Sequence, residues 1–417
     1  MSNSVETQAD RGSVWRNRDF VFLWSGQTIS TLGTAASSVV FPLLILFLSG
    51  SPAAAGIAGA LSSLPYLLFS LPVGALIDRW DRKLVMVLSD LGRALSLASI
   101  PATSFFGVLT IEQLYVNAFI EGTLFVFYNI AETAALTRVV PKHQLPAAYA
   151  QNQVADTLAF LVGPSVGTLL YQGVSKMAPF IVDAVSYVGS VITLLFIRKP
   201  LQAERQETIE KKDLLREIRE GISWWWQRPL LRFQAFLNSG LSLLFSSPLL
   251  LIILAKELGA QDADVGLILS VASLGGIVGT FIGRWMQRRF TYGQAVPSVV
   301  LYQAIIFPFI ALSPNLLVFA LAVALSFAMW PAYDVVQYTY RLAMIPDALQ
   351  GRVNSSFRLI AWGTRPLGAV LTGFLIEWVG ARSTTLAFAG LFLALSLAAF
   401  ANIHVRNAPP LETLSGE

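Results

Sequence analysis

Long apolar runs occupy most of this sequence. Twelve segments of about 20 residues or more contain at most a few charged side chains. A bilayer core is about 30 Å thick, and about 20 residues of α-helix cross it. Because no water reaches that core, only helices and closed barrels satisfy the backbone there, and runs this long favour helices. The segments lie near residues 20–48, 54–77, 84–107, 113–138, 147–172, 177–197, 231–254, 264–286, 294–313, 315–341, 353–379 and 383–404.

The composition is typical of a chain that lies in lipid. Of its 417 residues, 55% are hydrophobic and 13% are charged, whereas a soluble domain carries about 25% charged residues. The first apolar run is nearly 30 residues long. That length exceeds the apolar core of a secretory signal peptide, so we expect no removed leader. The sequence predicts an all-α integral membrane protein with twelve transmembrane helices.

Lysine and arginine are distributed unevenly between the two alternating sets of loops. If the N-terminus is cytoplasmic, the cytoplasmic segments hold 23 of these residues, and the opposite loops hold only Lys176, Lys256 and Arg382. Basic loops are retained on the cytoplasmic side when helices insert. We therefore expect a multi-pass protein of the cell (inner or plasma) membrane with both termini in the cytoplasm.

A charged stretch after the second run has a counterpart in the second half of the chain. Five of the six residues 78–83 are charged, and Gly74 precedes them by about one helical turn. Gly279 and Arg284 repeat the spacing of Gly74 and Arg79, 205 residues further on. We therefore predict a duplicated protein in which each half carries a glycine followed by a basic tight turn.

The one long hydrophilic stretch lies midway along the chain and divides it. We predict an N-terminal six-helix bundle with a cytoplasmic tail in residues 1–197 and a C-terminal six-helix bundle in residues 231–417. Residues 198–230 are expected to form a cytoplasmic linker with an amphipathic helix. Its three consecutive tryptophans, residues 224–226, would lie at the membrane interface.

The charged stretch resembles the loop 2–3 signature of the major facilitator superfamily, a glycine followed by an acidic residue and a basic cluster. The matching residues are Gly74, Asp78, Arg79, Arg82 and Lys83. Asp81 stands where the signature has its second glycine, and Gly283 stands where the second copy would have its acidic residue. The resemblance implies two pseudo-symmetric bundles with a ligand site between them near the membrane midplane. It also implies that this loop, with Glu132, Gly279 and Arg284, takes part in switching between conformations.

The fifth run contains a second motif. Gly163, Pro164 and Gly167 resemble the antiporter signature of exporters in this superfamily, while Ala159 and Thr168 replace its first and last glycines. Small residues let helices approach closely, and proline bends the helix. The resemblance is to bacterial drug and metabolite exporters that exchange protons. It implies efflux of a small amphiphilic drug or metabolite by alternating access.

Acidic side chains inside apolar runs are costly and usually serve an ion or substrate pathway. Glu121 lies about eight residues, or roughly 12 Å, inside the end of the fourth run and has no evident partner in the sequence. We predict that Glu121 carries the coupling proton. Asp156 and Asp334 are the alternatives.

Other charged residues in the runs are expected to be structural. Asp90 and Arg93 are three residues apart, so they can pair with each other on one helix face. Asp183 is expected to reach the interface from near the end of the sixth run. Glu132 is expected to pair with an arginine of the charged stretch, Arg79 or Arg82.

Polar and aromatic residues in the runs are candidates for the ligand cavity, with helix packing as the alternative for each. The candidates are Gln27, Tyr128, Asn129, Asn238, Tyr333, Gln337, Arg358 and Arg365. Arg365, near mid-membrane, is the best placed to attract an anionic group or a carboxylate. Arg358 has an alternative structural role, because it could pair with Asp334.

Several function classes find no support in the sequence. The chain has no cysteine, which excludes disulfides, thiolate catalysis and cysteine-bound zinc. It also has no phosphate-binding loop for ATP, and its two histidines, His143 and His404, are isolated. We expect no enzymatic activity, no cofactor and no metal. The net charge of +4 is spread over short loops, so we expect no nucleic-acid partner.

The expected partners are the lipid bilayer, a small-molecule substrate and protons, for a monomer. Two other functions remain open at this point. The chain could import or facilitate a small polar solute, or it could be a membrane sensor or assembly partner that keeps the fold without cycling.

Overall fold

The computed structural model describes residues 13–202, 214–244, 248–346 and 349–409. Within these ranges every regular element is a helix. The elements are η1 (Val14–Arg16), α1 (Arg18–Ser49), α2 (Pro52–Ile77), α3 (Arg82–Phe105), α4 (Ile111–Val139), η2 (Lys142–Gln144), α5 (Leu145–Gly173), α6 (Ala178–Phe196), α7 (Leu214–Trp226), α8 (Pro229–Leu244), α9 (Leu249–Glu257), α10 (Asp262–Arg289), α11 (Tyr292–Ala311), α12 (Leu316–Met344), α13 (Gln350–Gly363), α14 (Arg365–Val379), α15 (Ala381–Ala401) and α16 (Ile403–Arg406).

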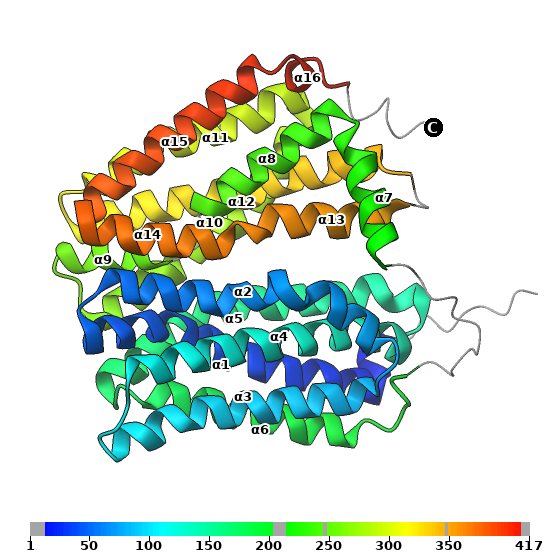
Figure 1. Cartoon of the computed structure of the whole chain (residues 1–417), viewed down its shortest axis with the longest axis vertical. Coiled ribbons are helices and arrows are strands. Elements are labelled where there is room, and N and C mark those ends of the chain that lie inside the picture. The colour runs from blue at the N-terminus through cyan, green and yellow to red at the C-terminus, as the bar shows by residue number, and fades with distance from the viewer. Residues whose placement is uncertain (1–12, 203–213, 245–247, 347–348, 410–417) are drawn as a thin grey trace, which may run out of the picture.

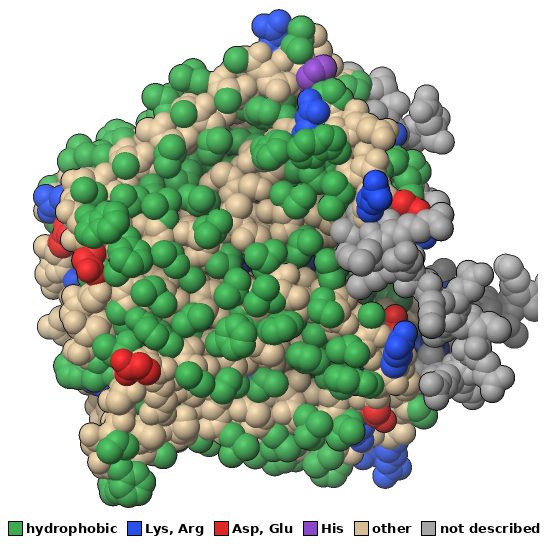
Figure 2. Space-filling view, viewed as in Figure 1, with side chains coloured by type: hydrophobic (Ala, Val, Ile, Leu, Met, Phe, Trp, Pro, Cys, Tyr) green, Lys and Arg blue, Asp and Glu red, His purple; other side chains and the backbone are tan. Residues whose placement is uncertain are grey.

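Twelve stretches of the described chain are helical, long and apolar enough to cross a membrane. The seventh includes α8 and α9, with residues 245–247 between them outside the described residues, and the eleventh includes most of α13 and all of α14. Figure 2 shows apolar side chains over the middle of the molecule and charged side chains gathered toward its two ends, which is how a lipid-facing surface is built. The predicted all-α membrane fold with twelve spans is confirmed.

Local capping explains why the second and third spans begin where they do. Ser51 Oγ accepts a hydrogen bond from Ala54 N at 3.1 Å, and Pro52 takes the first helical position of α2. Asp81 Oδ1 accepts from Leu84 N at 2.9 Å in the same way. α3 therefore starts at the charged stretch, two residues before the apolar run that predicted it.

Four glycines turn the chain at one end of the molecule. Gly50, Gly107, Gly259 and Gly380 follow α1, α3, α9 and α14, and their φ angles are 66°, 70°, 85° and 83°. Glycine adopts this left-handed conformation without a steric penalty. The turns lie at the left of Figure 1, opposite the C-terminus, and we call this the glycine-turn end.

The helices pack in two groups, α1–α6 and α8–α15, which lie one below the other in Figure 1. In the first group α1 packs on α5 and α6, α2 packs on α4, and α3 packs on both α4 and α6. In the second, α10 packs on α12 and α11 packs on α15. The groups meet where α2 packs on α14 and α5 packs on α10.

The predicted amphipathic helix is present as α7, but one of its indoles does not lie at an interface. Trp225 is buried, and its ring meets Phe357 of α13 edge-on with centroids 6.4 Å apart. Arg352 Nη1 and Glu220 Oε2 form an ion pair at 2.9 Å beside it. α7 is thus attached to α13. Residues 203–213 of the predicted linker lie outside the described residues.

The second glycine-basic copy is not a turn, contrary to prediction. Gly279 and Arg284 lie inside α10, which continues to Arg289. A Cβ on Gly279 would lie 1.9 Å from the carbonyl oxygen of Ala328, so this glycine permits close packing of α10 on α12. The equivalent first-half helix ends at Ile77, and residues 78–81, three of which are charged, form the turn before α3.

Candidate functional site

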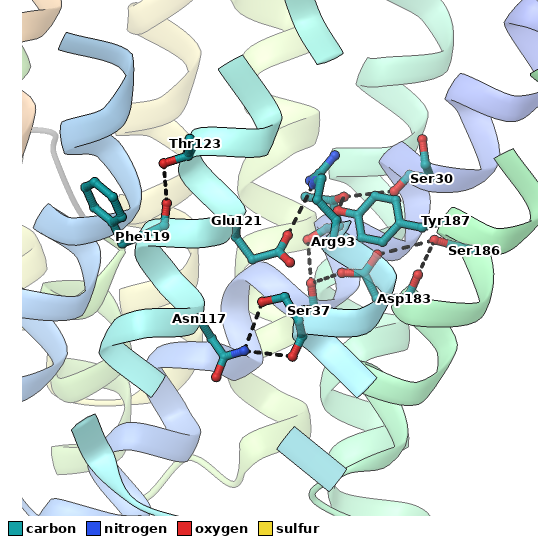
Figure 3. Close-up of polar contacts among 12 residues, drawn as sticks. Ser30, Ser37, Arg93, Asn117, Phe119, Glu121, Thr123, Asp183, Ser186 and Tyr187 are labelled. Atoms are coloured by element: carbon teal, nitrogen blue, oxygen red, sulfur yellow. Dashed lines mark hydrogen bonds and ion pairs between the residues drawn. The ribbon is translucent and has the colours of Figure 1, made fainter. Parts of the chain in front are cut away.

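An ion pair joins α3 and α4 inside the first group of helices. Arg93 Nε donates to Glu121 Oε2 at 3.2 Å, and the Arg93 guanidinium also lies 4.1 Å from the ring centroid of Tyr187 on α6. Figure 3 shows Glu121 reaching toward Arg93 from α4. The arginine is buried, while the Glu121 side chain keeps 18% of its surface exposed. Glu121, which has no evident partner in the sequence, is thus paired with a residue of a neighbouring helix.

A second carboxylate, Asp183 of α6, is buried in the same region. Its side chain accepts hydrogen bonds from Ser37 Oγ of α1 and from Ser186 Oγ at 3.3 Å. Only 1% of the residue is exposed, so the expectation that it reaches the interface is wrong. Arg93 lies close enough to Asp183 for their charges to interact. Asp183 therefore belongs to the cluster around Arg93.

A third carboxylate, Asp90, lies one turn before Arg93 on α3. It is fully buried, and neither of its side-chain oxygens has a hydrogen-bond partner. The predicted pairing of Asp90 with Arg93 is not the bond that forms, because the guanidinium donates to Glu121 instead. Its charge still interacts with that of Arg93.

We define the Arg93 cluster as Asp90, Arg93, Glu121 and Asp183. It contains three carboxylates and one guanidinium, so it carries a net charge of −2 when every member is ionised. Uncompensated charge inside a membrane is expensive and is relieved by a proton or a counter-ion. Within the described residues no group of His, Asp and Glu side chains has the arrangement of a metal site. The cluster is suited to hold protons.

The charged stretch anchors helix ends near the opposite, cytoplasm-predicted end. Arg82 Nη1 donates to the carbonyl oxygens of Ala134 and Leu201, at 3.1 and 3.2 Å, and Lys83 Nζ donates to that of Ile197 at 2.9 Å. Ile197 is the C-cap of α6, where a cation offsets the negative end of the helix, while Ala134 lies in the last two turns of α4. Asp78 is 70% exposed and lies 3.8 Å from Arg82.

Glu132 is not paired with either arginine that the sequence offered. Its Oε1 accepts from Asn152 Nδ2 of α5 at 3.4 Å, and the residue is buried. Arg82 is occupied by backbone carbonyls, and Arg79 is exposed. Glu132 therefore links α4 to α5.

Four of the predicted cavity residues are buried in helix packing. Asn238 of α8 donates through Nδ2 to Gln337 Oε1 at 3.0 Å, and Tyr333 OH donates to Asn238 Oδ1 at 3.2 Å. Tyr128 of α4 is also buried, and its hydroxyl has no hydrogen-bond partner. In this conformation these four side chains are buried, which is the helix-packing alternative given for them.

The remaining predicted residues keep accessible surface. Gln27 on α1 and Asp156 on α5 are half-buried, whereas Asn129 on α4 and Asp334 on α12 are exposed. Arg284 is exposed on α10. They stay candidates for contact with a ligand or a proton.

Arg358 and Arg365 flank one tryptophan on the face of α13 and α14 that points toward α2. The guanidinium carbons lie 4.5 and 4.6 Å from the ring centroid of Trp362. Tyr66 of α2 lies against the same indole, with ring centroids 5.6 Å apart. Arg358 Nη2 donates to Tyr66 OH at 3.2 Å, so the predicted pairing of Arg358 with Asp334 is wrong.

At the glycine-turn end the two groups of helices touch without intervening side chains. A Cβ on Gly56 of α2 would lie 2.9 Å from the Cα of Gly373 on α14. On the other flank, a Cβ on Gly266 of α10 would lie 2.4 Å from the carbonyl oxygen of Pro164 on α5. We call these two contacts the glycine seam.

Hydrogen bonds reinforce the glycine seam. Ser165 Oγ and Ser270 Oγ are 2.8 Å apart across α5 and α10. Across α2 and α14, Glu377 Oε2 accepts from Ser51 Oγ at 2.5 Å and from Ala53 N at 3.0 Å. The carboxylate of Glu377 thus caps the N-terminus of α2 from the other group of helices.

The antiporter-like motif on α5 supports this packing. A Cβ on Gly163 would lie 2.5 Å from Ala35 Cβ, and one on Gly167 would lie 2.0 Å from the carbonyl oxygen of Ala36. Both contacts are with α1, so the glycines let α5 approach α1 while its opposite side, at Pro164, meets α10.

The sequence of this chain matches a known protein family over nearly its whole length. Residues 13–415 match the sequence profile of the transmembrane secretion effectors, a division of the major facilitator superfamily. The chain belongs to the transmembrane secretion effector family. It is a membrane transporter of the major facilitator class, as its signature motifs predicted.

Two groups of characterised relatives of this secretion effector are efflux proteins. The multidrug efflux pump Tap of Mycolicibacterium fortuitum is 27% identical over 377 residues, which cover 88% of this chain and 89% of Tap. Macrolide efflux protein A of Streptococcus pyogenes is 27% identical over 204 residues, about half of either chain. These similarities support a bacterial plasma-membrane transporter.

Solved structures show the same fold at low sequence identity. A point mutant of the nucleoside transporter NupG superposes with a TM-score of 0.79 at 13% identity, over 92% of this chain and 99% of that one. A bacterial homologue of the iron transporter ferroportin, in its inward-facing state, superposes with a TM-score of 0.69 at 15% identity, over 94% of this chain and all of that one. At these identities the likeness is one of fold.

Proposed function

We propose that this protein is a proton-coupled exporter of small amphiphilic drugs or metabolites that works by alternating access as a monomer. Its two bundles are residues 1–197 and 231–417, joined by the linker 198–230. The efflux activity of Tap and of macrolide efflux protein A supports the direction of transport. The observation that carries proton coupling is the Arg93 cluster, in which two buried carboxylates, Asp90 and Asp183, and the partly exposed Glu121 surround one guanidinium.

The described conformation is inward-facing under this proposal. The bias of lysine and arginine puts both termini in the cytoplasm, so the glycine-turn end faces outward. The glycine seam then closes the outer side. Ligand enters from the cytoplasm, and the seam must part before the ligand leaves.

The chemistry assigned to the Arg93 cluster is exchange of a proton at Glu121. Glu121 is the member with exposed surface, and its Oε2 accepts the bond from Arg93. When this carboxylate takes up a proton it loses most of its attraction for the guanidinium, and Asp183 and Asp90 become the stronger partners of Arg93. Arg93 then shifts within α3 toward α6. A change in how α3, α4 and α6 pack is thereby coupled to one proton.

Glu121→Gln tests the proposal, because glutamine keeps the shape but cannot release a proton. In proteoliposomes the parent should expel a fluorescent amphiphile when the outside is acidified and should move protons in the opposite direction. Glu121→Gln should lose accumulation against a gradient while retaining binding and passive counterflow.

Glu112→Gln is the matched control. Glu112 is an exposed residue in the first turn of the same helix, so its substitution should leave both activities unchanged. Pumping by Glu121→Gln with the pH dependence of the parent would refute the assignment. Amphiphile and protons moving in the same direction would show import in place of export.

A further inference from the structure

The two arginines beside Trp362 form no ion pair with an acidic residue of the described chain. Among the described residues, no carboxylate lies within ion-pair distance of Arg358 or Arg365, and the acidic residue whose charge reaches Arg365 is Asp334 of α12. Both side chains are exposed. Arg365 is 13 residues into a span of 28, Arg352–Val379, which places it near the middle of the membrane. A guanidinium at that depth without an ion-pair partner is costly unless water or a ligand meets it, and Arg358 lies about two turns nearer the cytoplasm-predicted end.

The arginines lie between the two groups of helices and not toward lipid. Tyr66 of α2 contacts both Arg358 and Trp362, and a Cβ on Gly363 would lie 3.1 Å from Leu67 of α2. This face of α13 therefore points across the molecule at the first group of helices. A ligand between the two groups would meet it.

The backbone adds a further positive end at the same place. α13 ends at Gly363 and α14 begins at Arg365, because Pro366 has no N–H to continue the ladder. The N-terminus of the 15-residue helix α14 thus lies at mid-span, where its dipole favours negative charge. Thr364 Oγ1, which could cap that end, instead donates to the carbonyl oxygen of Ser239 at 2.8 Å.

We propose that Arg358, Trp362 and Arg365, with Tyr66 from the opposite group, form a binding site for an organic anion. The ligand class is an amphiphile that joins one carboxylate, sulfonate or phosphate group to a planar apolar body. Guanidinium groups bind such oxyanions through paired N–H donors. The indole and phenol rings offer faces on which a planar body stacks.

This inference rests on the proposed exporter and names its substrate class. It also fixes an electrical property of transport. Exchange of one entering proton for one leaving monoanion moves two charges in the same sense, so an inside-negative potential drives it. Exchange of one proton for one monocation moves no net charge.

Binding of three matched probes tests the site. Pyrenebutyrate, pyrenebutanol and pyrenebutylamine share one apolar body and differ only in the charge of the head group. In nanodiscs, with empty nanodiscs subtracted, calorimetry should show at least ~10-fold tighter binding of the anion than of the alcohol. Equal binding of all three probes, or tightest binding of the amine, would overturn the proposal.

Substitutions then locate the site. Arg365→Gln and Arg358→Gln should each weaken binding of the anion by about 10-fold. Binding of the alcohol should stay within about twofold of the parent, which also shows that the variants are folded. The affinity of Arg365→Lys for the anion should fall between those of the parent and of Arg365→Gln, because lysine keeps the charge but not the planar group of N–H donors. Arg406→Gln removes an equal charge from the exposed end of α16 and should change nothing. An equal loss of anion affinity in Arg406→Gln and in the two site variants would overturn the assignment.

Transport of the same probes separates this inference from the proposed function. Proton-driven movement of the amine by a protein that does not bind the anion would leave the exporter standing and refute the anion site. Anion binding that depends on Arg365, without movement of any probe along an imposed proton gradient, would support the site and refute the exporter.

Discussion

Gly266→Ala should hold the protein open at the glycine seam. The added Cβ would lie 1.9 Å from Thr168 Oγ1 and 2.4 Å from the carbonyl oxygen of Pro164. The hydroxyl can rotate away, but the backbone carbonyl cannot. Such overpacking costs about 1–3 kcal/mol. The gain of up to about 1 kcal/mol in helix propensity acts in open and closed states alike and cancels.

A cost of about 2 kcal/mol multiplies the open population by roughly 30. Ser270→Cys provides the assay, because the chain has no cysteine of its own and Ser270 is buried against Ser165 across the seam. In this background, Gly266→Ala should raise the rate of maleimide labelling of purified protein by about that factor. Gly390→Ala makes the same change in α15 with no atom within 4 Å and should leave the rate unchanged. Equal labelling of the two variants would refute the reasoning.

Two further outcomes are expected. Asp78→Asn should slow transport without lowering the melting temperature, because Asp78 is exposed and only loosely paired with Arg82 in this conformation; a protein that melts earlier would assign the carboxylate to folding instead. A cysteine at Ser51 should react with an impermeant maleimide on intact cells and one at Gln202 only after lysis, and labelling of Gln202 from outside would reverse the assigned orientation.

The length of the apolar runs was enough to predict the spans, because a long apolar segment in lipid is stable only as a helix. α3 and the eleventh span differ from the apolar runs that predicted them. α3 begins at Arg82 because Asp81 caps it, a local signal that hydropathy ignores. The eleventh run, predicted as one helix, is divided at Thr364, and Pro366 was the visible sign of that break.

The partners of buried charges could not be predicted from the sequence. Asp183 bonds Ser37, 146 residues away, and Arg93 bonds Glu121, 28 residues away. Spacing within one helix identifies neighbours on that helix only, so it paired Asp90 with Arg93. The same spacing offered no partner for Glu121. Which helices adjoin is set by packing, and packing decided these contacts.

The repeat predicted a tight turn in each half, and only the first of these turns forms. Gly74 and Gly279 are 205 residues apart in the sequence, but α2 ends at Ile77, soon after Gly74, whereas α10 continues from Gly279 to Arg289. A glycine followed by basic residues is compatible with a turn, and equally with a helix that packs closely at the glycine and has basic residues at its end. The close approach of the Ala328 carbonyl to Gly279 shows that the second copy is the helix.

The glycine seam has a consequence for how such a protein can adapt. At Gly56 and Gly266 any side chain overlaps a neighbouring backbone, so these positions tolerate almost no variation. Around Trp362 the arginine side chains are exposed and free to be replaced without disturbing the core. A lineage under selection by a new toxic compound can therefore retune recognition at one location while its closing mechanism stays fixed at another. Variants with altered ligand range should accumulate between α2 and α13 and spare the seam.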